Sequence, residues 1–181
     1  MRRLLLVRHA ATGATRDFAF PADEPLDARG RNEAAQLSVP RGYGVISSPA
    51  LRCAQTAQAA GLTVDRVEPA LAESNFGTWA GRTLSKVADD DMAAWMADPD
   101  ATPHGGESLR AFARRVGDWL DGEAIAEGAD AVITHGGVIK AAVVHALGAP
   151  LEAFWRVDVA PLSKSEMHAH DGRWTVARFN A

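Results

Sequence analysis

The sequence predicts an α/β fold: a single three-layer α/β/α domain with a mostly parallel sheet and an antiparallel edge strand. Three observations predict it. Short β-branched runs alternate with helical patterns, each run ends in small or polar residues, and a late pair of extended segments is joined by a tight turn. The length of 181 residues and the hydrophobic content of 47% suit one folded unit that covers residues 1–181.

The first half of the chain alternates strand and helix. Strands are expected at Arg3–Val7, Val45–Ser47 and Thr63–Val67, and helices at Ala28–Leu37 and Ala50–Ala60. Ser48 is expected to cap the second helix, with Pro49 in its first turn and Gly61 at its end. A loop that carries Glu73 follows the third strand.

The second half continues the alternation and then becomes extended. Helices are expected at Met92–Met96, Ser108–Leu120 and Val138–Leu147, a strand at Ala131–Thr134, and extended segments at Val157–Val159, Ser163–Ala169 and Trp174–Phe179. Asp171-Gly172 predicts a hairpin turn between the last two segments. The acidic run Asp89–Asp91 is typical of a helix start.

Composition excludes several classes of function. A formal charge of -4 gives no basic surface for nucleic acid, and no apolar run approaches the roughly 20 residues of a membrane span. The single cysteine, Cys53, forms no internal disulfide and favours a reducing compartment. We expect a cytoplasmic protein, a monomer or homodimer, whose partner is a small-molecule phosphate.

The ends of three predicted strands carry basic side chains. Arg8 and His9 follow the first strand, Arg52 lies just after the second, and His135 follows the fourth. If these strands are parallel neighbours, their carboxyl ends bring the four groups into one pocket. Such a cluster suits a phosphoryl group, whose charge is redistributed in the transition state.

Five segments in order resemble the motifs of the histidine phosphatase superfamily, the phosphoglycerate mutase-like proteins. They are Leu6–His9, Ser47–Thr56, Leu71–Trp79, Gly105–Ser108 and Thr134–Ile139. The likeness runs nearly end to end. Two positions depart from the family pattern: Ala10, where the family usually has glycine, and Ala80, where it often has an acidic residue.

The resemblance implies a role for each strand-end residue. His9 would be the nucleophile, forming a phosphohistidine, while Arg8, Arg52 and the imidazolium of His135 surround the phosphoryl group. The backbone amides of Gly136 and Gly137 could add donors to the phosphate, although two glycines at a tight strand-to-helix turn are explained equally well by the turn alone. Neither a metal nor a cofactor is required.

The proton donor to the leaving group is expected to be Glu73, with Phe76 and Trp79 as an apolar wall that raises its pKa. Glu107 is the competing acid, but the residues around it are typical of a helix start, so a structural role is expected for it. The pair His168 and His170 lacks a third metal ligand in the sequence pattern.

Two segments, residues 12–26 and 81–105, are expected to cover the pocket. Thr12, Phe18 and Trp95 are the candidate substrate-binding residues. The arginine and lysine residues of these two segments are Arg16, Arg82 and Lys86. So few cations favour a monophosphate with a neutral or aromatic body. Short family members with the Phe-Gly-x-Trp pattern include α-ribazole-5'-phosphate phosphatases, so that substrate is a candidate.

The leading interpretation is therefore a phosphomonoesterase. A phosphoglycerate mutase would use the same phosphohistidine but would need cations for a second anionic group. A non-catalytic member that binds phosphorylated ligands would lose the nucleophile or the acid, whereas His9 and Glu73 are both present.

Overall fold

The computed structural model describes all 181 residues and contains one six-stranded sheet in the order β3-β2-β4-β1-β5-β6. The first four strands in this order are parallel, and the last two form the antiparallel edge. The strands are β1 (Arg2–Arg8), β2 (Gly44–Ser47), β3 (Arg66–Val67), β4 (Gly128–Thr134), β5 (Lys164–His170) and β6 (Arg173–Arg178). The predicted mostly parallel sheet with an antiparallel edge is confirmed.

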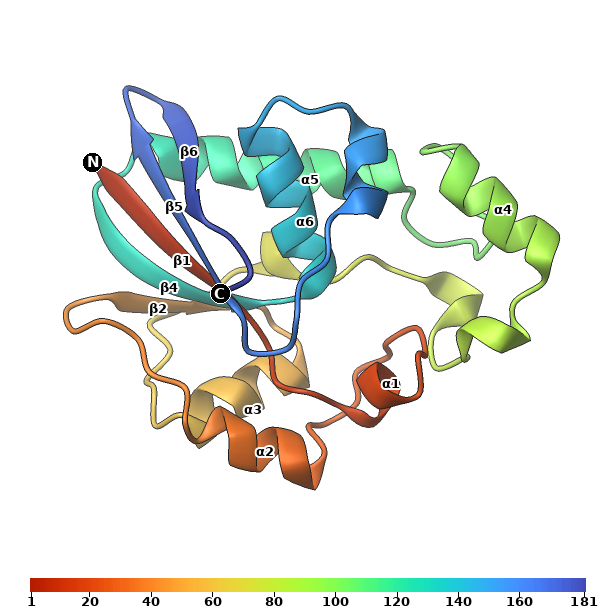
Figure 1. Ribbon diagram of the computed structural model, residues 1–181, viewed down its shortest axis with the longest axis horizontal. Helices are drawn as coiled ribbons and strands as arrows, with labels where there is room; N and C mark the ends of the chain where they lie inside the picture. Colours follow the sequence, from red (N-terminus) through yellow and green to blue (C-terminus); the bar gives the residue numbers. More distant parts are fainter.

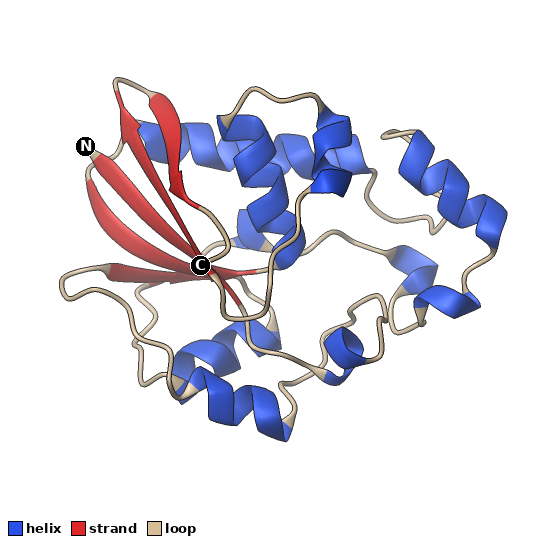
Figure 2. Ribbon diagram, in the orientation of Figure 1, coloured by secondary structure: helices blue, strands red, loops and turns tan.

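Helices cover both faces of this sheet, as Figures 1 and 2 show. The helices α2 (Ala28–Ala34) and α3 (Leu51–Ala59) lie on one face, and α5 (Leu109–Ala124) and α6 (Gly136–Ala146) on the other. The structure has the three layers that the sequence predicts. None of these helices is both long and apolar enough to cross a membrane.

The alternation of side chains along β1 explains why both faces need a helical layer. Leu4 and Leu6 belong to the main core beneath α5 and α6, whereas Leu5 and Val7 pack in a separate cluster with Leu37. Successive side chains of a strand point to opposite faces, so a continuous apolar run indicates a strand that is buried on both.

Short helical elements extend beyond the carboxyl ends of the strands, to the right in Figure 1. They are α1 (Gly13–Arg16), α4 (Asp89–Ala97) and the 3-10 helices η2 (Gly77–Trp79) and η3 (Leu84–Lys86), whereas the 3-10 helices η1 (Pro69–Leu71) and η4 (Leu151–Arg156) pack into the main core through Leu71 and Phe154. Phe20, Trp79 and Val87 form a small core of their own here, with Phe76 and Trp95 packed against it. This second cluster is the lid of the site described below.

Several predicted boundaries differ from the structure. Only Arg66 and Val67 of the third predicted strand pair with β2, and the predicted extended segment Val157–Val159 is a loop. Helix α3 begins at Leu51 with Ala50 as its N-cap, so Ser48 is not the cap; its hydroxyl accepts from the Ala50 amide at 3.3 Å and also binds His135. Pro49 precedes the helix.

Other boundaries shift by a few residues. The Met92–Met96 helix extends to Asp89–Ala97, and its three aspartates form the first turn as predicted. Ser108 caps α5 through a hydrogen bond that its hydroxyl accepts from the amide of Ala111. Asp171 and Gly172 both have positive φ, 50° and 72°, which suits the tight hairpin turn predicted there.

Candidate active site

The parallel register aligns the carboxyl ends of β1, β4 and β2. Arg8 pairs with Thr134 across β1 and β4, and Ser47 pairs with Ile133 across β2 and β4. The ladder continues one residue further, because the His9 amide donates to the Thr134 carbonyl at 2.9 Å. The His9 and His135 rings consequently meet with their centroids 5.2 Å apart.

His9 is buried and held in one tautomer. Its Nδ1 lies 2.7 Å from the Ala10 carbonyl oxygen, which can only accept, so Nδ1 carries the proton and Nε2 keeps a lone pair. Burial, reinforced by the charge of Arg52, lowers the pKa of His9 to about 3. The ring is therefore neutral at physiological pH, and its lone pair is on Nε2.

Ala10 shows why a glycine is not needed after His9 in this chain. Its φ is not positive, so the backbone there is accessible to any residue. Its methyl group is buried against Leu26 and Ala34, and its amide donates to the Thr56 hydroxyl at 3.0 Å. The Thr56 hydroxyl in turn donates to the Arg52 carbonyl at 2.7 Å, which ties the His9 loop to α3.

Arg52 joins the two histidines. Its Nε donates to Nε2 of His9 at 3.2 Å, one terminal nitrogen lies 3.0 Å from Nδ1 of His135, and the other donates to the Ala22 carbonyl at 2.7 Å. The side chain is 3% exposed. A buried guanidinium fork with two neutral imidazole partners keeps its full positive charge at the site.

His135 differs from the imidazolium that the sequence analysis expected. Its Nδ1 accepts from Arg52, so its Nε2 carries the proton and donates to the Ser48 hydroxyl at 2.8 Å. Burial, with the neighbouring charge of Arg52, lowers the pKa of His135 well below its ordinary value. A second proton, on Nδ1, would point at the buried guanidinium of Arg52. His135 is therefore neutral in this arrangement.

Arg8 reaches the same site from the end of β1 and also lines a cavity. It donates to the Val159 carbonyl and lies against the first turn of α6, where a Cβ on Gly136 would come within 3.4 Å of its Nε. Its Nε is buried without a partner in the protein. An anion held between Arg8 and the start of α6 would supply one.

The side chain of Glu73, from the loop after η1, packs against the N-terminus of α6. Its carboxylate accepts from the Ser74 amide at 3.0 Å and from the Gly137 amide at 3.3 Å. A Cβ on Gly137 would sit 2.3 Å from the Glu73 carboxylate, so a larger residue at this position would displace that carboxylate. Phe76 lines the same cavity as Glu73, whereas Trp79 packs away from it in the lid cluster.

Glu107 stands outside the cavity and has a structural partner. Both of its carboxylate oxygens accept from Arg115, at 3.0 and 2.8 Å. Arg115 also donates to the carbonyls of Ala70 and Ala72, at 2.8 and 3.0 Å. This cluster fixes the loop that presents Glu73, which agrees with the structural role expected for Glu107.

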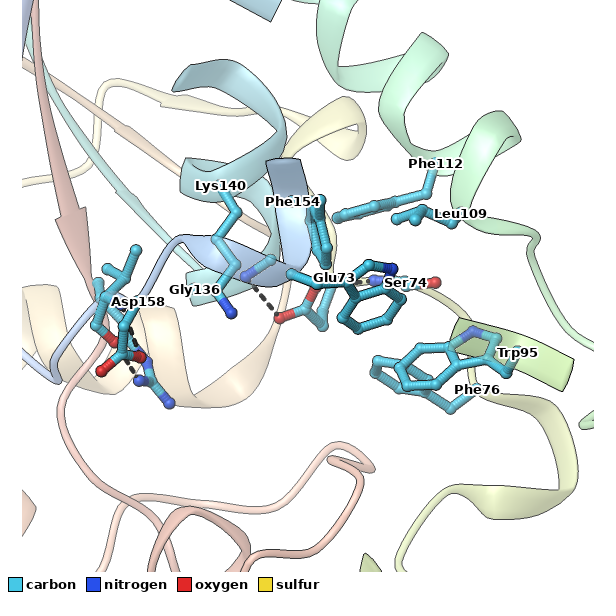
Figure 3. Close-up of a pocket in the computed structure, with 14 residues that line it drawn as sticks. Glu73, Ser74, Phe76, Trp95, Leu109, Phe112, Gly136, Lys140, Phe154 and Asp158 are labelled. Carbon is cyan, nitrogen blue, oxygen red and sulfur yellow. Dashed lines mark hydrogen bonds between the residues drawn. The ribbon is translucent and has the colours of Figure 1, made fainter. Parts of the chain in front are cut away.

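The cavity has a volume of about 230 Å³ and lies between the start of α6, the loop after η4 and the lid (Figure 3). Its polar wall contains Arg8, Glu73 and Lys140, and its apolar lining consists of Phe76, Trp95, Leu109, Phe112, Phe154, Trp155 and Val159. His9, Arg52 and His135 are buried and do not line it.

Two of the three predicted substrate-binding residues do not line this cavity. Trp95 does, but Phe18 is 74% exposed on a turn with a left-handed φ of 51°. Thr12 is fully buried, caps α1 and donates to the Glu24 carboxylate at 3.0 Å. Both residues lie in the covering segment, where Thr12 has a structural role and the Phe18 side chain faces solvent.

Lys140, Trp155 and Asp158 are among the residues of the cavity wall that the sequence did not predict. Lys140 carried a usable signal, because it follows Gly136 by four residues and shares its helix face. Trp155 and Asp158 carried none, because they belong to η4 and to the loop after it. No group of three or more His, Cys, Asp or Glu side chains is arranged to hold a metal, and His170 lies at the surface beside Asp171.

The chain resembles known phosphatases over its whole length. It is 29% identical over 194 residues to the adenosylcobalamin/alpha-ribazole phosphatase of Salmonella typhimurium, which covers 99% of this chain and 96% of that protein. The solved structure of mycobacterial glucosyl-3-phosphoglycerate phosphatase with VO3 is 27% identical, with a TM-score of 0.84 and 100% coverage of both chains.

A longer relative is a bifunctional protein of Mycobacterium tuberculosis, 34% identical over 195 residues. That match covers 98% of this chain but 53% of the relative, so the chain spans about half the length of that protein. The sequence matches the description "Histidine phosphatase superfamily (branch 1)" over residues 4–181. This match includes every strand-end residue described above, and the chain belongs to branch 1 of the histidine phosphatase superfamily.

Proposed function

We propose that this protein is a phosphomonoesterase that hydrolyses a small-molecule phosphate through a phosphohistidine on His9, without a metal. One observation carries the proposal: Nδ1–H of His9 is fixed on the Ala10 carbonyl, so the lone pair of Nε2 faces the guanidinium of Arg52. A neutral imidazole nitrogen beside fixed positive charge suits attack on a phosphoryl group. The phosphatase relatives support this reaction class.

The first step transfers the phosphoryl group to His9. Nε2 forms a bond to phosphorus as the ester P–O bond breaks, and the leaving oxygen takes a proton from the carboxyl group of Glu73. Arg52 now donates to phosphoryl oxygens in place of Nε2, and Arg8 binds from the other side. The positive charge of both guanidinium groups is present before the reaction and needs no reorganisation.

The second step releases inorganic phosphate. Glu73, now a carboxylate, accepts a proton from a water molecule, the water oxygen bonds to phosphorus, and the N–P bond breaks. Nε2 recovers its lone pair and Glu73 its proton. The position of Glu73 in the wall of the cavity proposed to hold the leaving group supports this double role.

The substrate body is proposed to occupy the cavity of about 230 Å³. The aromatic rings of Phe76, Trp95 and Trp155 support α-ribazole-5'-phosphate as a candidate, because a flat base stacks well on such a wall. The shortage of cations inferred from the sequence needs correction, since Lys140 lines the cavity. The objection to a phosphoglycerate mutase is therefore weaker than the sequence indicated.

The test is to trap the intermediate. During turnover of a labelled phosphomonoester, quenching in alkali should recover a phosphoramidate that hydrolyses in acid, and His9→Ala should abolish both label and turnover. Label on a serine or an aspartate would contradict the proposal. Isomerisation of 3-phosphoglycerate that depends on 2,3-bisphosphoglycerate and exceeds phosphate release would favour the mutase. Binding of phosphate without any turnover would favour the non-catalytic alternative.

A further inference from the structure

Lys140 is a cation in the cavity wall with no partner. Its ammonium takes part in no hydrogen bond or ion pair with any of the 181 residues, and it lies 5.4 Å from the ring centroid of Phe154. The side chain is half-buried, and burial lowers the pKa of Lys140, an effect that the charges of Asp158 and Glu73 partly offset. A charge withdrawn from water in this way costs free energy until an anion binds it.

The two carboxylates near Lys140 are occupied elsewhere. Glu73 accepts from the backbone amides of Ser74 and Gly137, and the Asp158 carboxylate accepts from the Val159 amide at 2.9 Å. The negative charge of Asp158 also acts on Arg8. In the step in which Glu73 carries a proton, its negative charge disappears and Lys140 is left with less compensation.

The position of Lys140 fits a leaving group. It lies one helical turn after Gly136, so it shares the face of α6 that carries the phosphate end of the site. Figure 3 shows the side chain descending between Asp158 and Phe154, with its amine directed toward the open part of the cavity. A substrate with its phosphate near Arg8 therefore places its leaving group between Lys140 and the aromatic residues Trp95 and Phe76.

We infer that Lys140 selects phosphomonoesters of hydroxy acids, in which the leaving group carries one carboxylate on a flat or apolar body. The inference rests on the proposed function and narrows its substrate class to acids, which removes α-ribazole-5'-phosphate, whose leaving group has no carboxylate, from the candidates. A single carboxylate matches a single ammonium, whereas a second phosphate would bring more negative charge close to Asp158. The aromatic wall supplies the contact for the body.

The test compares two substrates that differ in one charge. 4-Carboxyphenyl phosphate and 4-carbamoylphenyl phosphate have nearly the same shape, and the 3-substituted pair samples a second position. The measurement is the ratio of kcat/KM for acid over amide in wild type, Lys140→Met, Lys140→Arg and the control Lys86→Met. Lys86 is an exposed lysine of η3 that does not line the cavity.

We expect Lys140→Met to lower this ratio roughly tenfold or more for at least one pair, the size of a hydrogen bond between charged groups. Lys140→Arg should keep most of the wild-type acid-over-amide ratio, and Lys86→Met should leave this ratio unchanged. Dividing by the wild-type ratio removes differences in leaving-group reactivity.

An unchanged ratio in Lys140→Met for both pairs, with His9 still labelled during turnover, overturns the inference alone. Equal losses in Lys86→Met and Lys140→Met would also overturn it, because the effect would then be one of net charge. If wild-type His9 is never labelled, the proposed function fails and the inference fails with it.

Discussion

At the scale of single residues, one guanidinium sets the state of both histidines. Arg52 donates to His9 and approaches His135, and burial lowers the pKa of each ring. Both imidazoles are therefore neutral, and the fixed positive charge of the site belongs to Arg8 and Arg52. A neutral His9 is a nucleophile over a wide pH range, since its protonated form becomes dominant only near pH 3.

The lowered pKa of His9 predicts how stability depends on pH. In the unfolded chain this ring binds a proton near pH 6.5, whereas in the folded protein it does so only near pH 3. Between these values the unfolded state holds more protons, so the free energy of unfolding falls as the pH falls, by about 1.4 kcal/mol per pH unit for one such group. Above pH 6.5 the effect ends.

His9→Asn should therefore make the pH dependence less steep between about pH 3.5 and 6, measured by urea unfolding at a series of pH values. The exposed His170 is the control, and His170→Asn should keep the wild-type slope. A wild-type slope in His9→Asn would mean that the folded protein does not hold this ring neutral.

The role of Glu73 predicts a dependence on the leaving group. Glu73→Gln should slow phosphorylation of His9 by an alkyl phosphate by about 10² to 10⁴, the usual contribution of a positioned acid. It should slow p-nitrophenyl phosphate less, because nitrophenolate departs without a proton. Single-turnover measurements isolate this step from dephosphorylation.

Glu107→Gln is the matched control, because Glu107 acts through Arg115 on the loop of Glu73. It should slow both substrates by similar factors. Equal losses on both substrates in Glu73→Gln, with a leaving-group dependence in Glu107→Gln instead, would exchange the roles of the two residues.

At the scale of elements, the first two turns of α6 and its N-cap contribute three parts of the site. His135 is its N-cap residue, the Gly137 amide holds Glu73, and Lys140 follows one turn later on the cavity wall. The N-terminus of a helix also favours negative charge, which suits both the phosphate and the carboxylate of Glu73. The two glycines of this turn have different neighbours: Gly136 lies against Arg8, and Gly137 lies against Glu73.

Gly137→Ala and Gly136→Ala test this difference. A Cβ at position 137 would lie 2.3 Å from a Glu73 oxygen and must displace the carboxylate, whereas one at 136 would lie 3.4 Å from Arg8, an ordinary contact. Gly137→Ala should lose activity on alkyl phosphates by about 10²-fold or more, close to the loss of the acid itself, and Gly136→Ala should lose far less. Thermal unfolding checks that both variants fold, and equal activities would contradict the geometry.

How far the sequence predicted this site depended on the kind of element. Arg8, His9, Arg52 and His135 sit at or just beyond the ends of buried strands, so a local apolar run and the rule for parallel sheets were enough to bring them together. Phe18, Trp155 and Asp158 lie in short turns and 3-10 segments, which have no hydrophobic period. Which of them face the cavity depends on how the lid packs, and this is not encoded locally.

At the scale of the whole molecule, the arginines at the two ends of β1 differ in their ion pairing. At the start of β1, Arg2 is paired with Glu123 and Asp130, and Arg66 also reaches Glu123. At the other end of β1, Arg8 forms no ion pair and donates to the Val159 carbonyl instead. A chain with a net charge of -4 thus keeps one cation, Arg8, at the carboxyl end of β1 without an ion-pair partner.

This distribution predicts that the protein itself supplies the charge that metal ions provide in other phosphatases. Exhaustive chelation should leave kcat/KM essentially unchanged, because Arg8 and Arg52 supply the positive charge in the proposed reaction. Vanadate, which mimics the five-coordinate transition state, should inhibit competitively, and Arg52→Ala should weaken that inhibition strongly by removing the fork between the two histidines. His170→Asn, at the surface, should keep wild-type inhibition. Activity that is lost on chelation and restored by Zn²⁺ or Mn²⁺ would mean that the arginines do not provide the charge and that the phosphoryl group is bound in another way.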